Sequence, residues 1–327
     1  MDIRLFDERL SLTANYFYEY RDDILMYRNS APSWLAVDLP PLNIGEMENE
    51  GFEVQATWQK QTGDFNYSIS GNISRAENKV LYMDEVPPRE PYQTMTGHSL
   101  GTRFGYIWEG FYSQAEIEKV RNGELPQPRA VEVQPGDMRY KDLNGDGIID
   151  QADRKPYGYP SNPQVTGGLN LDFSYKGLDL SMGFQGATEV SRSPWNAFRT
   201  PLVGGGTLGP VMETFYENHW TEERAENGTA KWPRPSFTNS NYNHRPSTFY
   251  NRNSSYIRLR SAELGYTFNG RALQNSGIKQ LRVYLRGNNV FTIVSDEFMG
   301  IDPERQPNLN MGYPLVKLYK AGLNITF

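Results

Sequence analysis

Residues 165–184 read VTGGLNLDFSYKGLDLSMGF, and in this stretch apolar side chains recur at every second position on both sides of one tight turn. The apolar positions are Val165, Leu169, Leu171, Phe173 and Tyr175 in the first run and Leu178, Leu180, Met182 and Phe184 in the second. A period of two gives a β-strand one apolar and one polar face. The Lys176–Gly177 pair favours a two-residue turn, because glycine readily adopts the positive φ that tight hairpins require. The stretch therefore predicts an antiparallel hairpin and an all-β fold.

Four further segments show the same alternation, at about 10–20, 52–58, 65–73 and 319–327. If these segments pair in one sheet, their apolar side chains form a continuous band and their polar side chains cover the other face. We expect the apolar band to include Leu12, Tyr16, Phe52, Trp58, Leu171, Phe173, Leu180 and Phe184. We expect the opposite face to carry Thr13, Asn15, Gln55, Asn170, Asp172 and Ser181.

Short and long connections alternate between the predicted strands. The short ones fall at 7–8, 61–64, 176–177 and 269–278, and the long ones at about 27–50, 84–162, 187–253 and 295–313. Outer-membrane barrels have short periplasmic turns and long external loops, whereas compact soluble domains seldom have several long irregular loops. The pattern predicts about nine spanning strands of an antiparallel transmembrane β-barrel. Residues 100–112 are assigned to an external loop, where a local hairpin is one option. Because bacterial single-chain barrels have even strand numbers, further strands are expected upstream.

Composition excludes several other classes of protein. The chain has 327 residues, a formal net charge of -6 and no cysteine. Without cysteine there is no disulfide framework and no thiolate metal site, and without clustered Lys and Arg there is no surface for nucleic acid. The sequence also lacks an apolar run of the roughly 20 residues that a spanning helix requires. The segment that follows Met1 does not read as a signal peptide, so we expect the chain to be part of a longer exported protein.

Three segments carry a family resemblance. They are residues 136–150 (GDMRYKDLNGDGIID), residues 255–268 (SYIRLRSAELGYTF), and residues 281–290 (LRVYLRGNNV) together with 300–304 (GIDPE). In combination they resemble the SusC/RagA family of TonB-linked outer-membrane proteins, over nearly the whole chain.

The resemblance implies a barrel of about 22 strands with a plugged lumen, the size typical of outer-membrane transporters. It implies a bacterial outer-membrane importer of glycan or peptide fragments that is not an enzyme and requires no cofactor. Its implied partners are outer-membrane lipid, a SusD-like surface lipoprotein that acts as a lid, and the TonB complex. Residues 1–327 would then be the carboxy-terminal barrel portion, without the plug, the TonB-contacting segment or the amino-terminal strands.

The segment from Asp142 to Asp153 has the ligand spacing of a calcium-binding loop, with glycine at its sixth position, Gly147. The expected ligands are the side chains of Asp142, Asn144, Asp146, Asp150 and Asp153 and the carbonyl of Ile148. Against this interpretation, the twelfth position is aspartate and not glutamate, and the flanking residues do not read as paired helices. The alternative is an Asx-rich turn without metal.

Two further features are candidates for contact with other molecules. Aromatic side chains in the longest loop, which are suited to stack on a sugar or contact a partner, are Trp195, Trp220, Trp232, Tyr242 and Tyr250. Packing within the loop or an aromatic belt at the membrane interface is the alternative. The terminal Phe327 ends the last alternating segment and resembles the assembly signal of outer-membrane proteins.

Three functional hypotheses therefore remain. The first is part of an importer, the second is a surface β-protein that binds glycan or calcium without transport, and the third is a secreted glycoside-acting enzyme. Acidic pairs such as Glu222–Glu223 are the residues the enzyme hypothesis would need, but the sequence does not fix the separation of two catalytic carboxylates. The sequence does not name a substrate.

Overall fold

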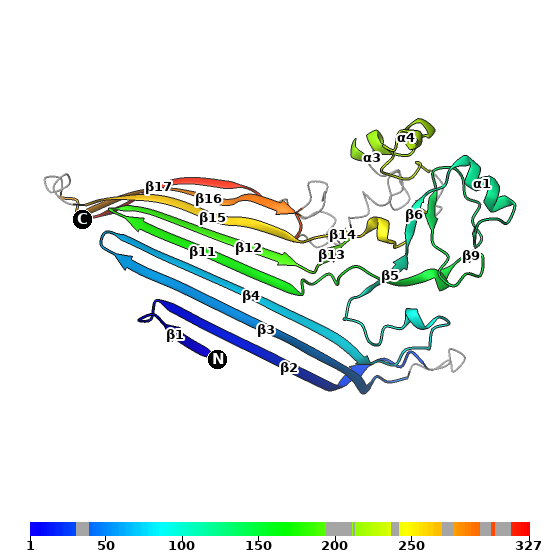
Figure 1. The fold of residues 1–327 in the computed structure, drawn as a ribbon, viewed down its shortest axis with the longest axis horizontal. Helices are drawn as coiled ribbons and strands as arrows, with labels where there is room; N and C mark the ends of the chain where they lie inside the picture. Colours follow the sequence, from blue (N-terminus) through cyan, green and yellow to red (C-terminus); the bar gives the residue numbers. More distant parts are fainter. Residues whose placement is uncertain are drawn as a thin grey trace.

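The structure is a computed structural model that describes residues 1–30, 39–193, 211, 213–236, 242–269, 277–294, 302–304 and 315–327. Its main element is a nine-stranded antiparallel sheet in which every strand pairs with its neighbours in chain order (Figure 1). The strands are β1 (Asp2–Leu5), β2 (Leu10–Met26), β3 (Leu42–Thr62), β4 (Phe65–Tyr82), β11 (Val165–Tyr175), β12 (Leu178–Thr188), β15 (Tyr256–Asn269), β16 (Gln280–Val294) and β17 (Leu318–Thr326). The prediction of nine strands and of an all-β fold is confirmed.

The turns explain the register of the sheet. Lys176 and Gly177 have φ values of 46° and 89°, so both central residues of the hairpin are left-handed, as a tight turn between twisted strands requires. Tyr175 consequently faces Leu178, and pairing continues without interruption to Val165 and Thr188. The predicted turn at 269–278 lies mostly outside the described residues.

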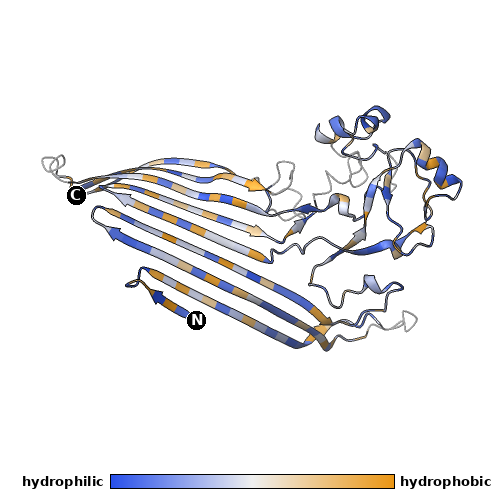
Figure 2. Cartoon of the chain, viewed as in Figure 1, coloured by the Kyte–Doolittle hydropathy of each residue, from blue (hydrophilic) through white to orange (hydrophobic). Residues whose placement is uncertain are grey.

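The two faces of the sheet have different chemistry. Directly paired residues project to the same face, and Leu180, Leu264 and Leu285 follow one another across β12, β15 and β16. One position away, Ser181, Glu263 and Arg286 form the matching polar row. The residues predicted for the apolar band and those predicted for the polar face also lie on opposite faces of the sheet. Both predictions are confirmed. The alternation is visible as stripes along the strands (Figure 2).

The residues of the two longest connections, 83–164 and 189–255, contribute the remaining elements at one end of the sheet (Figure 1). From the first connection these are η2 (Pro91–Gln93), β5 (Arg103–Tyr106), β6 (Trp108–Phe111), α1 (Gln114–Arg121), β7 (Gln127–Pro128), β8 (Met138–Tyr140), β9 (Ile148–Ile149), η3 (Gln151–Asp153) and β10 (Arg154–Tyr157). From the second they are β13 (Ser191–Arg192), α3 (Glu213–Asn218), α4 (Glu222–Glu226), η4 (Thr248–Tyr250) and β14 (Arg252–Asn253). Residues 100–112 lie among these elements and not in the main sheet, as predicted. The optional hairpin was wrong, because β5 pairs with β10 and β6 with β8.

These connections form one packed body, which we call the loop body. Its buried cluster contains residues of both connections, among them Tyr112, Met138 and Ile149 from the first and Phe249 and Tyr250 from the second. Helix α1 begins at the capping box of Ser113 and Glu116 and buries Ile117 and Val120 on one side. No described helix is long and apolar enough to cross a membrane. The main hydrophobic core therefore lies in the loop body, and the strands leave both faces of the sheet partly exposed.

Candidate functional site

The polar face of the sheet carries an ion-pair cluster near the β11–β12 turn. Arg282 on β16 contacts Asp179 on β12 at 2.5 Å and Glu263 on β15 at 2.7 Å, and Arg286 lies 3.7 Å from Glu263. The cluster ties three neighbouring strands together through side chains that all project to this face. Each member is partly solvent-exposed, so we assign the cluster a modest contribution to stability.

A polar cavity of about 860 Å³ lies on the same face, nearer the loop body. It is lined by Asn72, Asn170, Arg260, Ser261, Arg286, Asn288 and other side chains of β4, β11, β12, β15 and β16. Relative to β12, strand β15 has one extra residue between Leu259 and Ser261. This residue, Arg260, lines the cavity beside Ser261. Amides, a hydroxyl and guanidinium groups are suited to bind polar ligands through hydrogen bonds.

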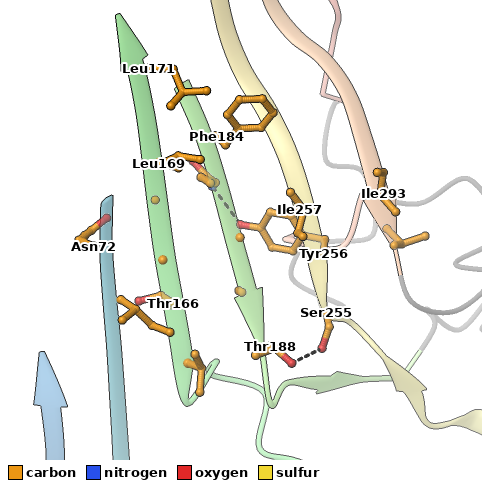
Figure 3. A pocket seen from close by; sticks show the side chains of 18 residues that line it. Asn72, Thr166, Leu169, Leu171, Phe184, Thr188, Ser255, Tyr256, Ile257 and Ile293 are labelled. Carbon is orange, nitrogen blue, oxygen red and sulfur yellow. Dashed lines mark hydrogen bonds between the residues drawn. The ribbon is translucent and has the colours of Figure 1, made fainter. Parts of the chain in front are cut away.

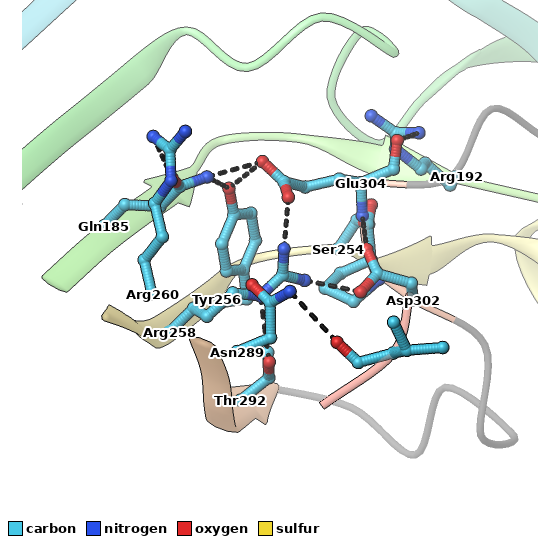
Figure 4. A network of polar contacts seen from close by, with 12 residues as sticks. Gln185, Arg192, Ser254, Tyr256, Arg258, Arg260, Asn289, Thr292, Asp302 and Glu304 are labelled. Carbon is cyan, nitrogen blue, oxygen red and sulfur yellow. Dashed lines mark hydrogen bonds and ion pairs between the residues drawn. The ribbon is translucent and has the colours of Figure 1, made fainter. Parts of the chain in front are cut away.

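Beside this cavity lies a polar network that we call the mouth clamp, made of Arg258, Tyr256, Gln185, Asp302 and Glu304 (Figure 4). The guanidinium of Arg258 is almost completely buried and pairs with the carboxylates of Asp302, at 2.5 Å, and Glu304. Its Nε also donates to Thr292 Oγ1 at 3.0 Å.

The remaining contacts of the clamp fix the segment 302–304 on the sheet. Glu304 Oε1 accepts from Gln185 Nε2 at 2.7 Å and from the Tyr256 hydroxyl at 2.5 Å. The Ser254 hydroxyl donates to the carbonyl of Pro303 at 2.8 Å. The segment that follows β16 is thereby held against β12 and β15.

In the loop from Asp142 to Asp153, most oxygens of the predicted calcium ligands accept hydrogen bonds from the loop itself. Asp142 accepts from the amides of Gly145 and Gly147 at 2.7 and 2.9 Å. Asp153 is completely buried and accepts from the amides of Leu143 and Asp150, each at 2.8 Å. Burial raises the pKa of the Asp153 carboxyl above its ordinary value.

The other predicted ligands are held in similar ways. Asp146 accepts from the amide of Ile148 at 2.9 Å, and Asn144 accepts from the amide of Asp146 at 3.1 Å. Asp150 caps η3 and contacts Arg129 at 2.9 Å. No group of three or more acidic or histidine side chains in the described part of the chain is arranged to hold a metal ion. Calcium binding by this loop stays a prediction.

The structure places four of the five predicted contact aromatics in the loop body. Trp232, Tyr242 and Tyr250 are buried in its core, and Tyr242 stacks beneath the guanidinium of Arg245 at 4.8 Å. Trp220 is partly exposed and lies against Gly136. Trp195 lies outside the described residues. In this conformation three of the rings are covered by protein, so contact with a ligand or a partner stays a prediction that requires the core to open.

Phe327 lies one residue beyond β17, whose last residue, Thr326, pairs with Gln280. Its side chain is 74% exposed, so the ring makes little contact with the described residues. A role as an assembly signal therefore stays a prediction.

Reasoning from sequence did not identify the mouth clamp. Its basic member and its acidic members lie in two of the segments quoted for their family resemblance, 255–268 and 300–304. The sequence did contain a signal for this cluster. Alternation places Arg258 on the polar face, and two carboxylates, Asp302 and Glu304, lie in one short segment later in the chain. Nothing local indicated that these segments meet.

Comparisons with known proteins agree with this architecture. A family model described as "TonB dependent receptor-like, beta-barrel" matches residues 2–290. TonB-dependent receptor P3 of Formosa agariphila is 29% identical over the whole chain, which spans 33% of that protein. TonB-dependent receptor SusC of Bacteroides thetaiotaomicron is 24% identical over 87% of the chain and 27% of its own length. The chain thus spans about a third of the length of the curated relatives it matches.

Solved structures show the same fold. The RagAB peptide importer in its open-open state superposes with a TM-score of 0.68 over 98% of this chain and 33% of that one, at 20% identity. The closed-closed state of the same importer gives a TM-score of 0.69 over 100% of this chain and 34% of that one, at 19% identity. The nine-stranded sheet therefore corresponds to part of a closed barrel.

Proposed function

This chain belongs to the TonB dependent receptor-like β-barrel family, a family of outer-membrane transporters and not of enzymes, and we propose that it forms the carboxy-terminal third of an importer barrel. One observation supports this most strongly. The nine strands keep an apolar face and a polar face in register across the whole sheet, from the Leu12–Ala56 pair to the Arg286–Lys320 pair. In a barrel the apolar face contacts lipid and the polar face lines the lumen.

We infer that the imported substrate is an oligosaccharide or an oligopeptide. The amides and guanidiniums around Asn170, Ser261 and Arg286 offer hydrogen bonds to either class, which is consistent with a wide polar passage. A SusD-like lipoprotein is the inferred lid, because one of the similar structures is the RagAB peptide importer. On this proposal the loop body, which packs at one end of the sheet, is the surface that the lid contacts. The TonB complex would act through parts of the receptor outside this chain.

The alternative is a surface β-protein that binds glycan or calcium without transport. The packed core of the loop body favours this alternative, because a rigid external body is suited to binding by itself. Labelled ligand that reaches the periplasm would indicate import, and ligand that stays at the cell surface would indicate binding alone.

The test uses the full-length receptor that contains this chain, in cells supplied with labelled oligosaccharides or oligopeptides. Asn170→Trp and Ser261→Trp narrow the lumen, whereas the control Leu171→Trp places the same ring on the outer face, one residue away from Asn170. We expect the first two variants to reduce uptake and the control to retain it, at equal barrel abundance. Equal uptake by all three variants, or binding without periplasmic accumulation in the parent, would contradict the proposal.

A further inference from the structure

The apolar face has a depression where two glycines lie side by side. Gly167 on β11 pairs with Gly186 on β12, and Ile73 and Ile257 continue the same row on the two flanking strands. The next row carries Leu169 paired with Phe184. Because two neighbouring positions lack side chains while their surroundings are large, a groove of about 750 Å³ opens on the outer face (Figure 3).

The glycines are required by the close approach of the strands. A Cβ atom on Gly167 would lie 3.0 Å from the carbonyl oxygen of Asn72, and one on Gly186 would lie 2.9 Å from that of Tyr256. The contact at Gly186 is too short for a Cβ atom, so a side chain there would force the strands to shift. At Gly167 the neighbouring strand would have to move by a few tenths of an ångström. The groove is thus a built feature of the strand packing.

The lining is almost wholly apolar, but its end nearest the loop body is polar. There the hydroxyls of Thr188 and Ser255 lie 2.9 Å apart. In the next row toward the loop body, Arg75 pairs with Val165 in the sheet. The guanidinium of Arg75 contacts Glu77 at 2.7 Å and Glu189 at 3.2 Å. An occupant of this groove therefore needs an apolar tail toward the membrane centre and a polar group toward the external loops.

We propose that the groove binds one acyl chain of an outer-leaflet lipid, with the lipid head group beside Thr188, Ser255 and Arg75. The groove is continuous with the apolar band, which in this family faces the bilayer, so lipid tails are its immediate surroundings. Its volume is within the range of about 300–1,000 Å³ that is common for small-molecule sites. The inference rests on the outer-membrane location and is independent of the imported substrate.

The experiment measures lipid that stays bound to the purified full-length receptor. The receptor is loaded with deuterium-labelled lipid A, the acylated lipid of the outer leaflet, exchanged into detergent, and analysed by mass spectrometry. In the groove variant, Ile73→Trp and Ile257→Trp together place two indole rings over the glycine pair. The control variant, Ile69→Trp with Tyr266→Trp, changes the same two strands on the same face outside the groove.

We expect the groove variant to retain about tenfold less labelled lipid, equivalent to about 1.4 kcal/mol, and the control to retain as much as the parent. Heat-modifiable migration in gels checks that each barrel is folded. If the double variant does not fold, Ile73→Trp alone replaces it, with Ile69→Trp as its control. No retained lipid in the parent, or equal retention in the groove and control variants, overturns the proposal. The proposal is also overturned if the groove variant changes the receptor from a dimer to a monomer while the amount of retained lipid is unchanged. The groove would then be a contact between two copies of the receptor.

Discussion

Replacing Arg258 by alanine should weaken the attachment of the segment 302–304 to the sheet without unfolding the barrel. Arg258 is buried, whereas the side chains of Asp302 and Glu304 are 21% and 41% exposed, so both carboxylates can be hydrated once the guanidinium is gone. The free energy lost when Arg258 is removed is therefore smaller than the penalty for leaving a fully buried charge without a partner. Because the guanidinium is charged, its hydrogen bonds to Asp302 and to Thr292 are both charge-assisted, and each contributes about 1.5 kcal/mol. We leave the more exposed Glu304 out of this sum because water screens its pair.

A loss of about 3 kcal/mol raises the population of the open segment about 100-fold, since each 1.4 kcal/mol corresponds to a factor of ten. The assay is hydrogen exchange at the Glu304 amide, which donates to Asp302 Oδ1 at 2.9 Å. Arg260→Ala is the matched control, because Arg260 is an exposed arginine two residues away that donates one long bond, of 3.3 Å, to Gln185 among the described residues. Arg258→Ala should accelerate exchange strongly and Arg260→Ala hardly at all. Equal exchange in the two variants would refute the idea that the buried guanidinium holds the segment.

Three further outcomes follow from the loops and the last strand. If the loop at 142–153 binds metal, calorimetry should show heat for calcium and little for magnesium, because a flexible oxygen-rich loop suits the larger ion. Asp142→Ala with Asp146→Ala should abolish that heat. Identical proteolysis with calcium and with chelator would show that the loop is a turn without metal. Deletion of Phe327 in the full-length receptor should lower its abundance in the outer membrane, and unchanged surface labelling would count against an assembly role. Burial raises the pKa of Tyr112 to about 12 from its ordinary 10.0, so its contribution to stability is complete below about pH 10 and is lost as the pH rises towards 12. Tyr112→Phe should therefore make alkaline loss of the near-ultraviolet dichroism of the loop body start at higher pH, and an unchanged midpoint would contradict this.

The fold of the sheet could be predicted from sequence because its determinants are local. The alternation in residues 165–184 and the Lys176–Gly177 turn fix two strands and their register, and the same period recurs in the other segments. The lengths of the connections then separate a membrane barrel from a soluble sandwich. The predicted polar set, including Asn170 and Asp172, faces away from the apolar band for the same reason.

The arrangement of the loops could not be predicted, because it depends on contacts between residues far apart in the chain. Asp137 accepts hydrogen bonds from Arg234 at 2.6 Å and from Asn243 at 2.8 Å, which joins the two long connections in one core. Each of these residues lies in an irregular segment without periodicity, so the sequence favoured separate loops.

The sequence by itself determined that this chain forms a two-faced antiparallel sheet of nine strands, since side-chain alternation is a property of each strand alone. Only the tertiary structure decided that the aromatic residues of the loops form a buried core, that Arg258 meets Asp302 and Glu304, and that two glycines open a groove on the apolar face. The physical reason is that packing and ion pairing depend on which surfaces meet in space. The alternation of apolar and polar residues in the sequence indicates only which face of the sheet each residue occupies.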